Sequence, residues 1–214
     1  LLHRNRQRGR IRFFSELEPH INDAEVIFLC LGTPPLPDGE ADMSSVEKVT
    51  RQIAAHSTCY KLIVEKSTVP VLTGDRIRRT LEIYGSAAPY DVASNPEFLS
   101  EGTAVEDFLH PTRTVIGVES PRAEALLSQI YEPITRQSFD CPIHRPCGRR
   151  GVEVPLVVTN RSSAELIKHA SNSFLAIRIS FINAIANLCE RVGADVAKVA
   201  EGMGLDPRIG PAFL

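Results

Sequence analysis

Two glutamates, Glu97 and Glu101, are the first candidates for chemistry in this sequence. They follow a short segment that is predicted to be a strand, Tyr90–Ser94, and an Asn-Pro pair, and they flank the apolar residues Phe98 and Leu99. Acids at this spacing also occur at the start of a helix, where the helix dipole favours negative charge. Apolar neighbours that exclude water raise the pKa of a carboxylate toward the range of a general base. The position of the two glutamates after a strand and their apolar neighbours favour the interpretation as a general base.

Other polar residues have spacings that favour a shared site. Lys168 and Asn172 are four residues apart in a predicted helix, so they share one face, either as a solvated edge or as part of a pocket. Ser67 and Thr68 follow a second predicted strand, where they could cap a helix, bind an anion, or do both. Gly32 and Thr33 follow a third such segment and could form an ordinary turn. Arg208 alone indicates little, and Cys189 is expected to pack in a core.

Apolar segments alternate with amphipathic ones in the first two thirds of the chain. Strands are predicted at 25–31, 61–65, 90–94 and 113–118, and helices at 44–56, 71–84 and 121–130. This alternation predicts an α/β fold with a doubly wound parallel sheet. Ligands bind beyond the carboxyl ends of strands in such sheets. The polar groups after residues 31, 65 and 94 are therefore expected at one common edge.

The last third of the chain is predicted to be mainly helical. After a short strand at 156–159, Ser162 and Glu165 have the spacing of a capping box. A stripe at helical spacing then predicts a long helix with one buried face, ending at Gly193: Ile167, Ala170, Phe174, Ile177, Phe181, Ile185 and Leu188. A further helix is expected at 195–203. The predicted domains are 1–136, a linker at 137–156, and a helical domain at 157–214.

Composition excludes several classes of partner. The 214 residues are 43% hydrophobic and 23% charged, as in globular proteins, with a net charge of −2 that implies no nucleic-acid or anionic-membrane partner. No uninterrupted apolar run approaches the roughly 18 residues that span a bilayer.

Five scattered cysteines favour reduced thiols in the cytoplasm. Cys141, His144 and Cys147 match no standard zinc spacing and show no fourth ligand, so no metal site is expected.

Five segments together give a more specific indication. They are VIFLCLGTPP, EKSTVPV, SNPEFLSEGTAVEDFLHPTRTVIG, AELIKHASNSFLAIRISFINAIANLCE and GADVAKVAEGMGLDPRIGPAFL. In this order they resemble the nucleotide-sugar 6-dehydrogenases of the UDP-glucose/GDP-mannose dehydrogenase family. The resemblance implies a partial Rossmann-like NAD-binding domain followed by a central domain that dimerises through the long helix 162–190. It also implies a two-step oxidation of UDP-glucose to UDP-glucuronate, with NAD as cofactor and a thioester intermediate.

The resemblance also implies a role for each candidate residue. Glu97 would activate water for thioester hydrolysis with help from Thr68, and Lys168 would stabilise the oxyanion with help from Asn172. Cofactor contacts would come from Gly32, Thr33, Ser67, Thr68 and Glu101. The UDP-sugar would contact Glu97, Phe98, Leu99, Glu101, Lys168 and Asn172, together with Arg208 from a neighbouring subunit of the homo-oligomer.

Two departures from the family pattern lead us to expect a fragment. The glycine-rich dinucleotide loop is absent, and the sequence stops before the segment with the nucleophilic cysteine. The chain alone is therefore expected to be inactive. Two alternatives stay open: a related GDP-mannose or UDP-N-acetylmannosamine dehydrogenase, and a non-catalytic module that dimerises.

Overall fold

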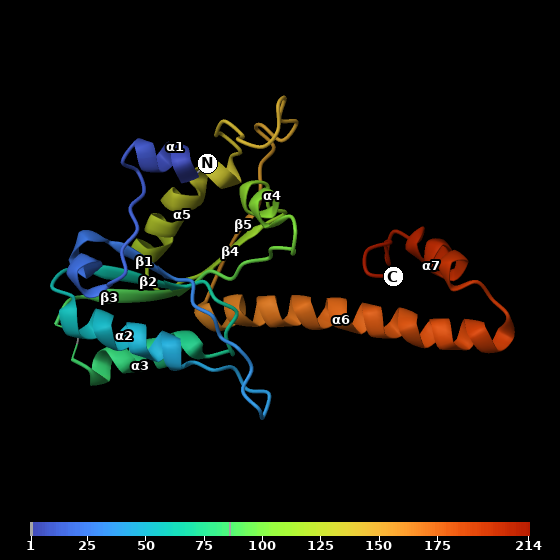
Figure 1. The fold of residues 1–214 in the computed structure, drawn as a ribbon, viewed down its shortest axis with the longest axis horizontal. Coiled ribbons are helices and arrows are strands. Elements are labelled where there is room, and N and C mark those ends of the chain that lie inside the picture. Colours follow the sequence, from blue (N-terminus) through green and yellow to red (C-terminus); the bar gives the residue numbers. More distant parts are fainter. Residues whose placement is uncertain (1, 86) are drawn as a thin grey trace. The chain divides into compact units, whose positions relative to one another are not determined.

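A computed structural model of the chain describes residues 2–85 and 87–214. The chain divides into two compact units, Leu1–Leu166 and Ile167–Leu214. The first unit holds a five-stranded sheet and its covering helices, and the second holds most of a long helix and one shorter helix (Figure 1).

The sheet has the strand order β1-β2-β3-β4-β5. Its strands are β1 (Val26–Leu29), β2 (Lys61–Glu65), β3 (Tyr90–Ser94), β4 (Thr114–Gly117) and β5 (Leu156–Thr159). The first three strands are parallel, as predicted. β4 is antiparallel to β3, and β5 is parallel to β4. The predicted α/β fold with a mainly parallel sheet is therefore confirmed, and the antiparallel pairing of β3 with β4 is a feature that the sequence did not indicate.

The reversal of β4 has a simple geometric cause. The connection from β3 contains only the short helix α4 (Ala104–Leu109), and β4 begins beyond the carboxyl end of β3. It then runs back until Gly117 pairs with Ser94. To run parallel to β3, β4 would have to begin at the opposite edge of the sheet. The connection would then have to cross back along the full length of the strand, usually through a longer helix.

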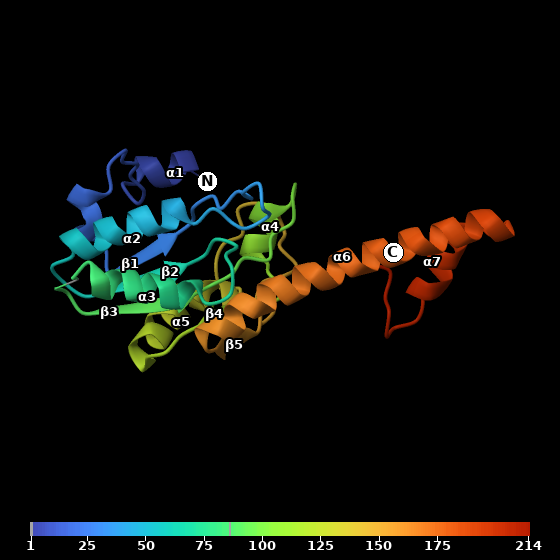
Figure 2. The same cartoon turned by 90° about the horizontal axis from the view of Figure 1, so that it is seen from below.

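Helices cover both faces of this sheet, which Figure 1 shows nearly edge-on and Figure 2 shows from one face. α2 (Ser44–His56) and α3 (Thr73–Ile83) pack on one face with Ile63, and α5 (Pro121–Thr135) packs on the other with Leu62 and Val64. Neighbouring residues of β2 thus point to opposite faces, and all five of its residues are buried. This burial on both faces explains why β2 is an unbroken apolar run in its centre.

The remaining elements of the first unit are short. They are α1 (Leu2–Gln7) and the 3-10 helix η1 (Glu18–Asp23).

The helix predicted at 44–56 has the expected bounds, and α3 is slightly shorter than predicted. α5 begins at Pro121 after the cap Ser120, as expected, and continues to Thr135.

The long helix α6 (Arg161–Val192) begins differently from the prediction. The cap is Asn160, whose side-chain oxygen accepts a hydrogen bond from Ser163 N at 2.8 Å. The predicted role of Glu165 in a capping box is therefore wrong. Its carboxylate instead accepts hydrogen bonds from Leu72 N at 2.6 Å and Gly74 N at 2.8 Å. Glu165 thus caps the beginning of α3, whose own cap residue, Leu72, makes no side-chain cap hydrogen bond in the described structure.

The apolar stripe of α6 is exposed. Phe174 is 60% exposed, Ile177 62%, Phe181 49% and Leu188 54%, so the prediction of a buried stripe is wrong within this chain. By length and composition alone, α6 could also cross a membrane, and 6% of its most apolar window is buried. Periodicity identifies the apolar face of a helix, but it does not identify what covers that face.

The second unit continues from α6 through a turn at Gly193, where φ is 73°. Asp195 then caps α7 (Val196–Gly204) by accepting a hydrogen bond from Ala197 N at 2.8 Å. Arg178 donates hydrogen bonds to the carbonyl oxygens of Ile209 and Gly210, at 2.9 and 2.7 Å. These bonds fasten the segment after α7 to α6. Cys189 is buried, as predicted.

The cap that Glu165 provides leads to a prediction about stability. Glu165→Ala leaves two backbone N–H groups without their charged acceptor, so we expect the free energy of unfolding to fall by about 2–4 kcal/mol. Urea denaturation followed by circular dichroism measures the change. Glu190→Ala, at an exposed position of the same helix, is the matched control and should change stability by less than about 0.5 kcal/mol. Equal midpoints for the two variants would contradict this role of Glu165.

Candidate functional site

The carboxyl ends of β1, β2 and β3 lie at one edge, where the sequence predicted a site. Leu29 and Ser94 both pair with Glu65, so the three strands end at the same level. Ser67 Oγ accepts a hydrogen bond from Leu31 N at 2.8 Å and donates one to Leu29 O at 3.2 Å. The hydroxyl of Thr33 donates to Thr68 O at 2.8 Å. The segments around Gly32–Thr33 and Ser67–Thr68 are thereby held together.

This edge has open space and an unsatisfied polar atom. A Cβ atom added to Gly32 would meet no heavy atom within 4 Å. Glu65 is buried and accepts a hydrogen bond from Ser67 N at 2.7 Å through Oε1, while its Oε2 has no partner among the described residues. Burial raises the pKa of Glu65 to about 7. Buried oxygens are nearly always hydrogen-bonded, so this atom fits an edge completed by a bound donor or a water molecule.

Glu97 and Glu101 lie in the loop between β3 and α4. Because α4 begins only at Ala104, the two acids do not share a helix face. Glu97 Oε2 accepts a hydrogen bond from Leu99 N at 2.6 Å, which orients its carboxylate. Glu101 is exposed. Asp107 of α4 holds the same loop by accepting a hydrogen bond from Ser100 N at 2.7 Å, and its hydrogen bonds hold the pKa of Asp107 below its usual value.

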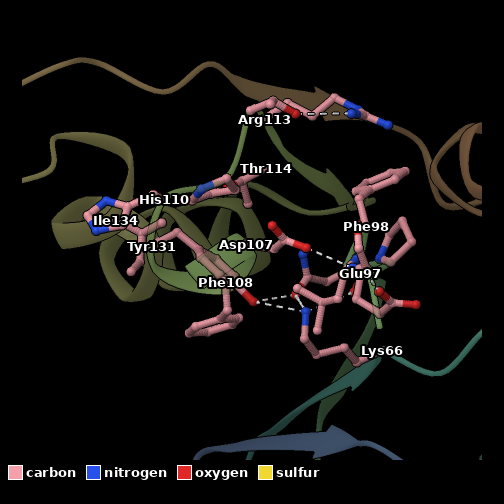
Figure 3. Close-up of a pocket in the computed structure, with 16 residues that line it drawn as sticks. Lys66, Glu97, Phe98, Asp107, Phe108, His110, Arg113, Thr114, Tyr131 and Ile134 are labelled. Atoms are coloured by element: carbon pink, nitrogen blue, oxygen red, sulfur yellow. Dashed lines mark hydrogen bonds between the residues drawn. The ribbon is translucent and has the colours of Figure 1, made fainter. Parts of the chain in front are cut away.

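A cavity of about 270 Å³ lies beside this loop (Figure 3). Glu97, Phe98 and Leu99 line it, and Glu101 is not among its lining residues. The guanidinium of Arg113 lies 3.9 Å from the centre of the Phe98 ring, a cation–π contact that fixes one wall. The cavity thus contains three of the residues that the resemblance implied for substrate binding.

The sequence did not identify a group of hydrogen-bonded polar residues that lines this cavity, namely Lys66, Asn95 and Tyr131. Lys66 Nζ donates a hydrogen bond to Asn95 Oδ1 at 3.1 Å, and the Tyr131 hydroxyl donates to the same oxygen. Asn95 donates in turn to Val115 O at 2.8 Å. Burial raises the pKa of Tyr131 to about 12, so its hydroxyl stays protonated as a donor. Lys66 and Asn95 directly follow strands and could have been found by that signal, whereas Tyr131 comes from the distant helix α5.

Three predicted site residues belong to the second unit. Lys168 and Asn172 lie one turn apart on α6; Lys168 is buried and Asn172 is exposed. Arg208 is exposed and pairs with Asp206, with Nη2 and Oδ2 2.7 Å apart. Arg178 holds the segment just after Arg208, as described above. The roles that the resemblance implied for these residues stay predictions.

A second cluster corrects an expectation about metal ligands. Cys141, His144 and Cys147 were predicted to have no fourth partner, but His110 joins them, and one ligand atom from each residue lies within 4.8 Å of the others. The spacing could not indicate His110, which lies 31 residues before Cys141.

Comparisons with known proteins agree with this architecture. Residues 1–135 match the NAD binding domain of the UDP-glucose/GDP-mannose dehydrogenase family, and residues 162–214 match its central domain. The chain belongs to this family. The NAD prediction is confirmed at the level of the domain family, and the open edge around Gly32 and Glu65 fits a ligand rich in hydroxyl and amide groups.

Individual relatives specify the similarity further. The chain is 44% identical over 209 residues to a UDP-glucose 6-dehydrogenase of Rhizobium meliloti, covering 96% of this chain and 44% of that protein. A UDP-glucose dehydrogenase structure from Pyrobaculum islandicum has a TM-score of 0.86 and 37% identity, covering 99% of this chain and 46% of that one. A GDP-mannose dehydrogenase structure from Pseudomonas aeruginosa has a TM-score of 0.81 and 28% identity, covering 96% and 44%. The chain thus spans less than half the length of these dehydrogenases.

The buried carboxyl of Glu65 leads to a prediction about pH. Its pKa of about 7 in the folded chain exceeds the ordinary value of 4.5, so the folded state binds the proton more tightly. The stabilising effect of protonation is complete below pH 4.5 and is lost as the pH rises to 7. We therefore expect this group alone to lower the free energy of unfolding by about 3 kcal/mol over that range.

Urea denaturation at a series of pH values, compared between wild type and Glu65→Gln, isolates this contribution. The variant should lose most of the slope between pH 4.5 and 7, because it cannot ionise. Glu40→Gln, at an exposed position, is the control and should keep the slope. An unchanged slope in Glu65→Gln would contradict the assignment.

Proposed function

We propose that the protein of which this chain forms a part oxidises UDP-glucose to UDP-glucuronate with NAD. The observation that carries the proposal is the family match over both domains, together with greater identity to UDP-glucose dehydrogenases than to the GDP-mannose enzyme. The edge formed by β1, β2 and β3 supports it, because ligands of such sheets bind beyond the carboxyl ends of the strands.

The cofactor site is assigned to the open edge. Gly32 leaves the backbone accessible, and the hydrogen bonds of the Thr33 and Ser67 hydroxyl groups hold this edge together. The proposed cofactor contacts here are Gly32, Thr33, Ser67 and Thr68. Glu101, on the neighbouring exposed loop, completes the proposed contacts. NAD, when bound, accepts the hydride from the sugar alcohol.

The hydrolytic step is assigned to Glu97 and Lys168. Glu97 takes a proton from water, and the hydrogen bond from Leu99 N supports this role by fixing the orientation of the carboxylate. Thr68, with an exposed side chain, helps to position that water. Lys168 stabilises the negative oxygen that develops during hydrolysis, and its burial supports this role because a fixed charge acts more strongly away from water. Asn172, one turn along α6, assists Lys168.

Substrate binding is assigned to seven residues in all. Phe98 and Leu99 line the cavity beside Glu97, and Arg113 stacks on the Phe98 ring. The residues proposed to contact the UDP-sugar are Glu97, Phe98, Leu99, Glu101, Lys168, Asn172 and Arg208. Arg208 is exposed and oriented by Asp206, which suits an arginine that reaches a neighbouring subunit.

The full-length protein tests the reaction and the role of Glu97. With UDP-glucose and NAD, NADH absorbance should rise, and GDP-mannose and UDP-N-acetylmannosamine should support much slower turnover. Glu97→Gln keeps the shape of the side chain but removes the base, so the steady rate should fall by roughly 10²–10⁴-fold. Glu124→Gln, on an exposed part of α5, is the control and should retain the wild-type rate. Wild-type turnover in Glu97→Gln would refute its role, and preference for another sugar nucleotide would refute the substrate.

We further propose that the protein is a cytoplasmic homo-oligomer that pairs through residues 162–190. The exposed apolar stripe of α6 supports this, because an apolar surface of this length is stabilised when a partner covers it. The repeat of the stripe at helical spacing suits pairing with the same helix of a second copy. All five cysteines are free, as expected of thiols in a reducing compartment.

Substitutions in the stripe test this interface. Phe174→Glu combined with Phe181→Glu places two charges in the apolar face, so the mass by light scattering should fall from that of the oligomer to that of smaller species. Asn183→Glu, on the opposite side of the same helix, should leave the mass unchanged. A wild-type monomer, or an oligomer that persists in the double variant, would contradict this interface.

A further inference from the structure

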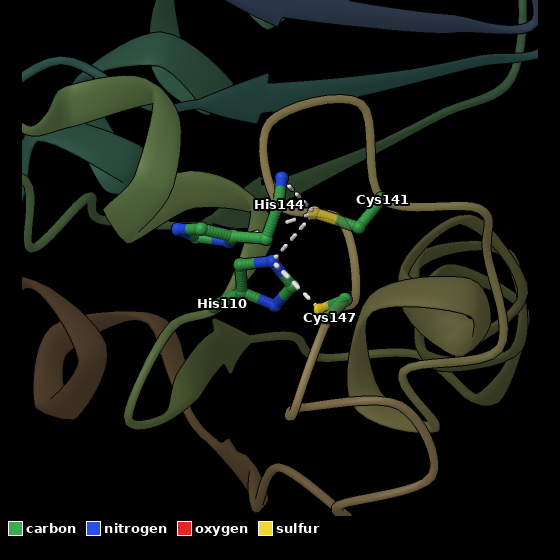
Figure 4. Close-up of side chains that lie close together, drawn as sticks. All are labelled: His110, Cys141, His144 and Cys147. Carbon is green, nitrogen blue, oxygen red and sulfur yellow. Dashed lines mark hydrogen bonds between the residues drawn. The ribbon is translucent and has the colours of Figure 1, made fainter.

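The cluster of His110, Cys141, His144 and Cys147 has the donor atoms of a structural metal site (Figure 4). His110 Nε2 lies 3.2 Å from Cys141 Sγ and 3.8 Å from Cys147 Sγ, and His144 Nδ1 lies 3.7 Å from Cys141 Sγ. Zinc bonds of about 2.3 Å to sulfur and 2.0–2.1 Å to nitrogen, at tetrahedral angles, place the two ligand types about 3.6 Å apart. The observed separations scatter around that value.

The hydrogen bonds of Gln137 fix the tautomer of His110 that a metal requires. Gln137 is buried, and its Nε2 donates to Leu109 O at 2.9 Å and Ile134 O at 2.7 Å. Both amide hydrogens are thereby used, so Oε1 must accept the hydrogen bond that joins it to His110 Nδ1. His110 therefore carries its proton on Nδ1, and its Nε2 lone pair points toward the two sulfur atoms. This is the usual arrangement of a histidine ligand that a neighbouring group orients.

His144 has the complementary arrangement. Its Nδ1 faces Cys141, while its Nε2 lies 3.6 Å from Glu106 Oε1. This separation is that of an ion pair rather than a hydrogen bond, and a carboxylate beside the second ring nitrogen of a histidine is common behind zinc ligands. Each imidazole thus presents one nitrogen to the thiols and has a polar partner at the other. Two thiols alone would suit a disulfide, but two oriented imidazoles favour a cation.

The surrounding chain also fits a structural role. Among the described residues, 139–155 form no helix or strand, and their hydrogen bonds to the preceding helix include Val154 N to Thr135 O at 2.7 Å. Three ligands come from this irregular segment, and the fourth directly follows α4. A metal would fasten the segment to α4, as structural zinc does in regions without a sufficient apolar core.

We propose that His110, Cys141, His144 and Cys147 bind one zinc ion that fastens segment 139–155 to the end of α4. Four protein ligands leave no open position, so the site is structural rather than catalytic. Two thiolates and two imidazoles suit zinc better than calcium or magnesium, which prefer oxygen ligands. The proposal is independent of the function proposed above.

Metal content and cobalt spectroscopy test the site directly. The full-length protein, purified under reducing conditions without chelator, should contain about one zinc per chain by plasma mass spectrometry. Cobalt(II) added to chelator-treated protein should give the visible bands of tetrahedral coordination and a near-ultraviolet sulfur-to-metal band. Cys141→Ser with Cys147→Ser should abolish both signals, whereas Cys59→Ser, at an exposed cysteine outside the cluster, should retain them.

A second variant keeps all four ligands and tests the orientation of His110. Gln137→Met removes the group that fixes the tautomer, so zinc affinity in competition with a chromophoric chelator should fall by about 10–100-fold. Gln129→Met, at an exposed position of α5, should leave the affinity unchanged. Metal-free wild type that shows no cobalt spectrum, or a Cys141–Cys147 disulfide with no bound metal, would overturn the proposal.

Discussion

Parallel pairing of β1, β2 and β3 is the constraint on which the candidate site depends. Glu65 pairs with Leu29 on one side and with Ser94 on the other, so the three strands end at one level. Because β2 is buried on both faces, a shift of one residue would turn its apolar side chains to the wrong helices. The register of an apolar strand therefore positions polar residues that lie outside the strand.

The sequence predicted those parts of the fold that local patterns determine. Apolar runs bounded by turns gave the strands, and helical spacing gave α2, α3 and α5 within a few residues. The direction of β4 depends on the path of its connection, which periodicity does not encode. Glu165 shows the same limit: its spacing from Ser162 suits a local cap, but tertiary packing brings its carboxylate to Leu72 and Gly74 instead.

Some residues of the candidate site could likewise be found from local sequence patterns, whereas others depend on tertiary packing. Residues in the loops just after strands, such as Thr33, Ser67 and Glu97, could be proposed from sequence because the end of an apolar run is visible there. Tyr131 could not, since it reaches Asn95 from a helix on one face of the sheet. The exposed stripe of α6 could be predicted only in part. Its apolar character was visible in the sequence, but its exposure depends on which surfaces the rest of the chain covers.

His110 belongs both to the cavity beside Glu97 and to the cluster with Cys141, His144 and Cys147. It lines the cavity beside Glu97, and it also faces Cys141 and Cys147. The helix before it carries Asp107, which holds the Glu97 loop through Ser100 N. A zinc ion at His110 would fix one end of α4, and the hydrogen bond to Asp107 already fixes the loop to that helix. The irregular segment 139–155, which the sequence indicated to be only a linker, would then support the loop that presents Glu97, because rigid supports keep site residues in place.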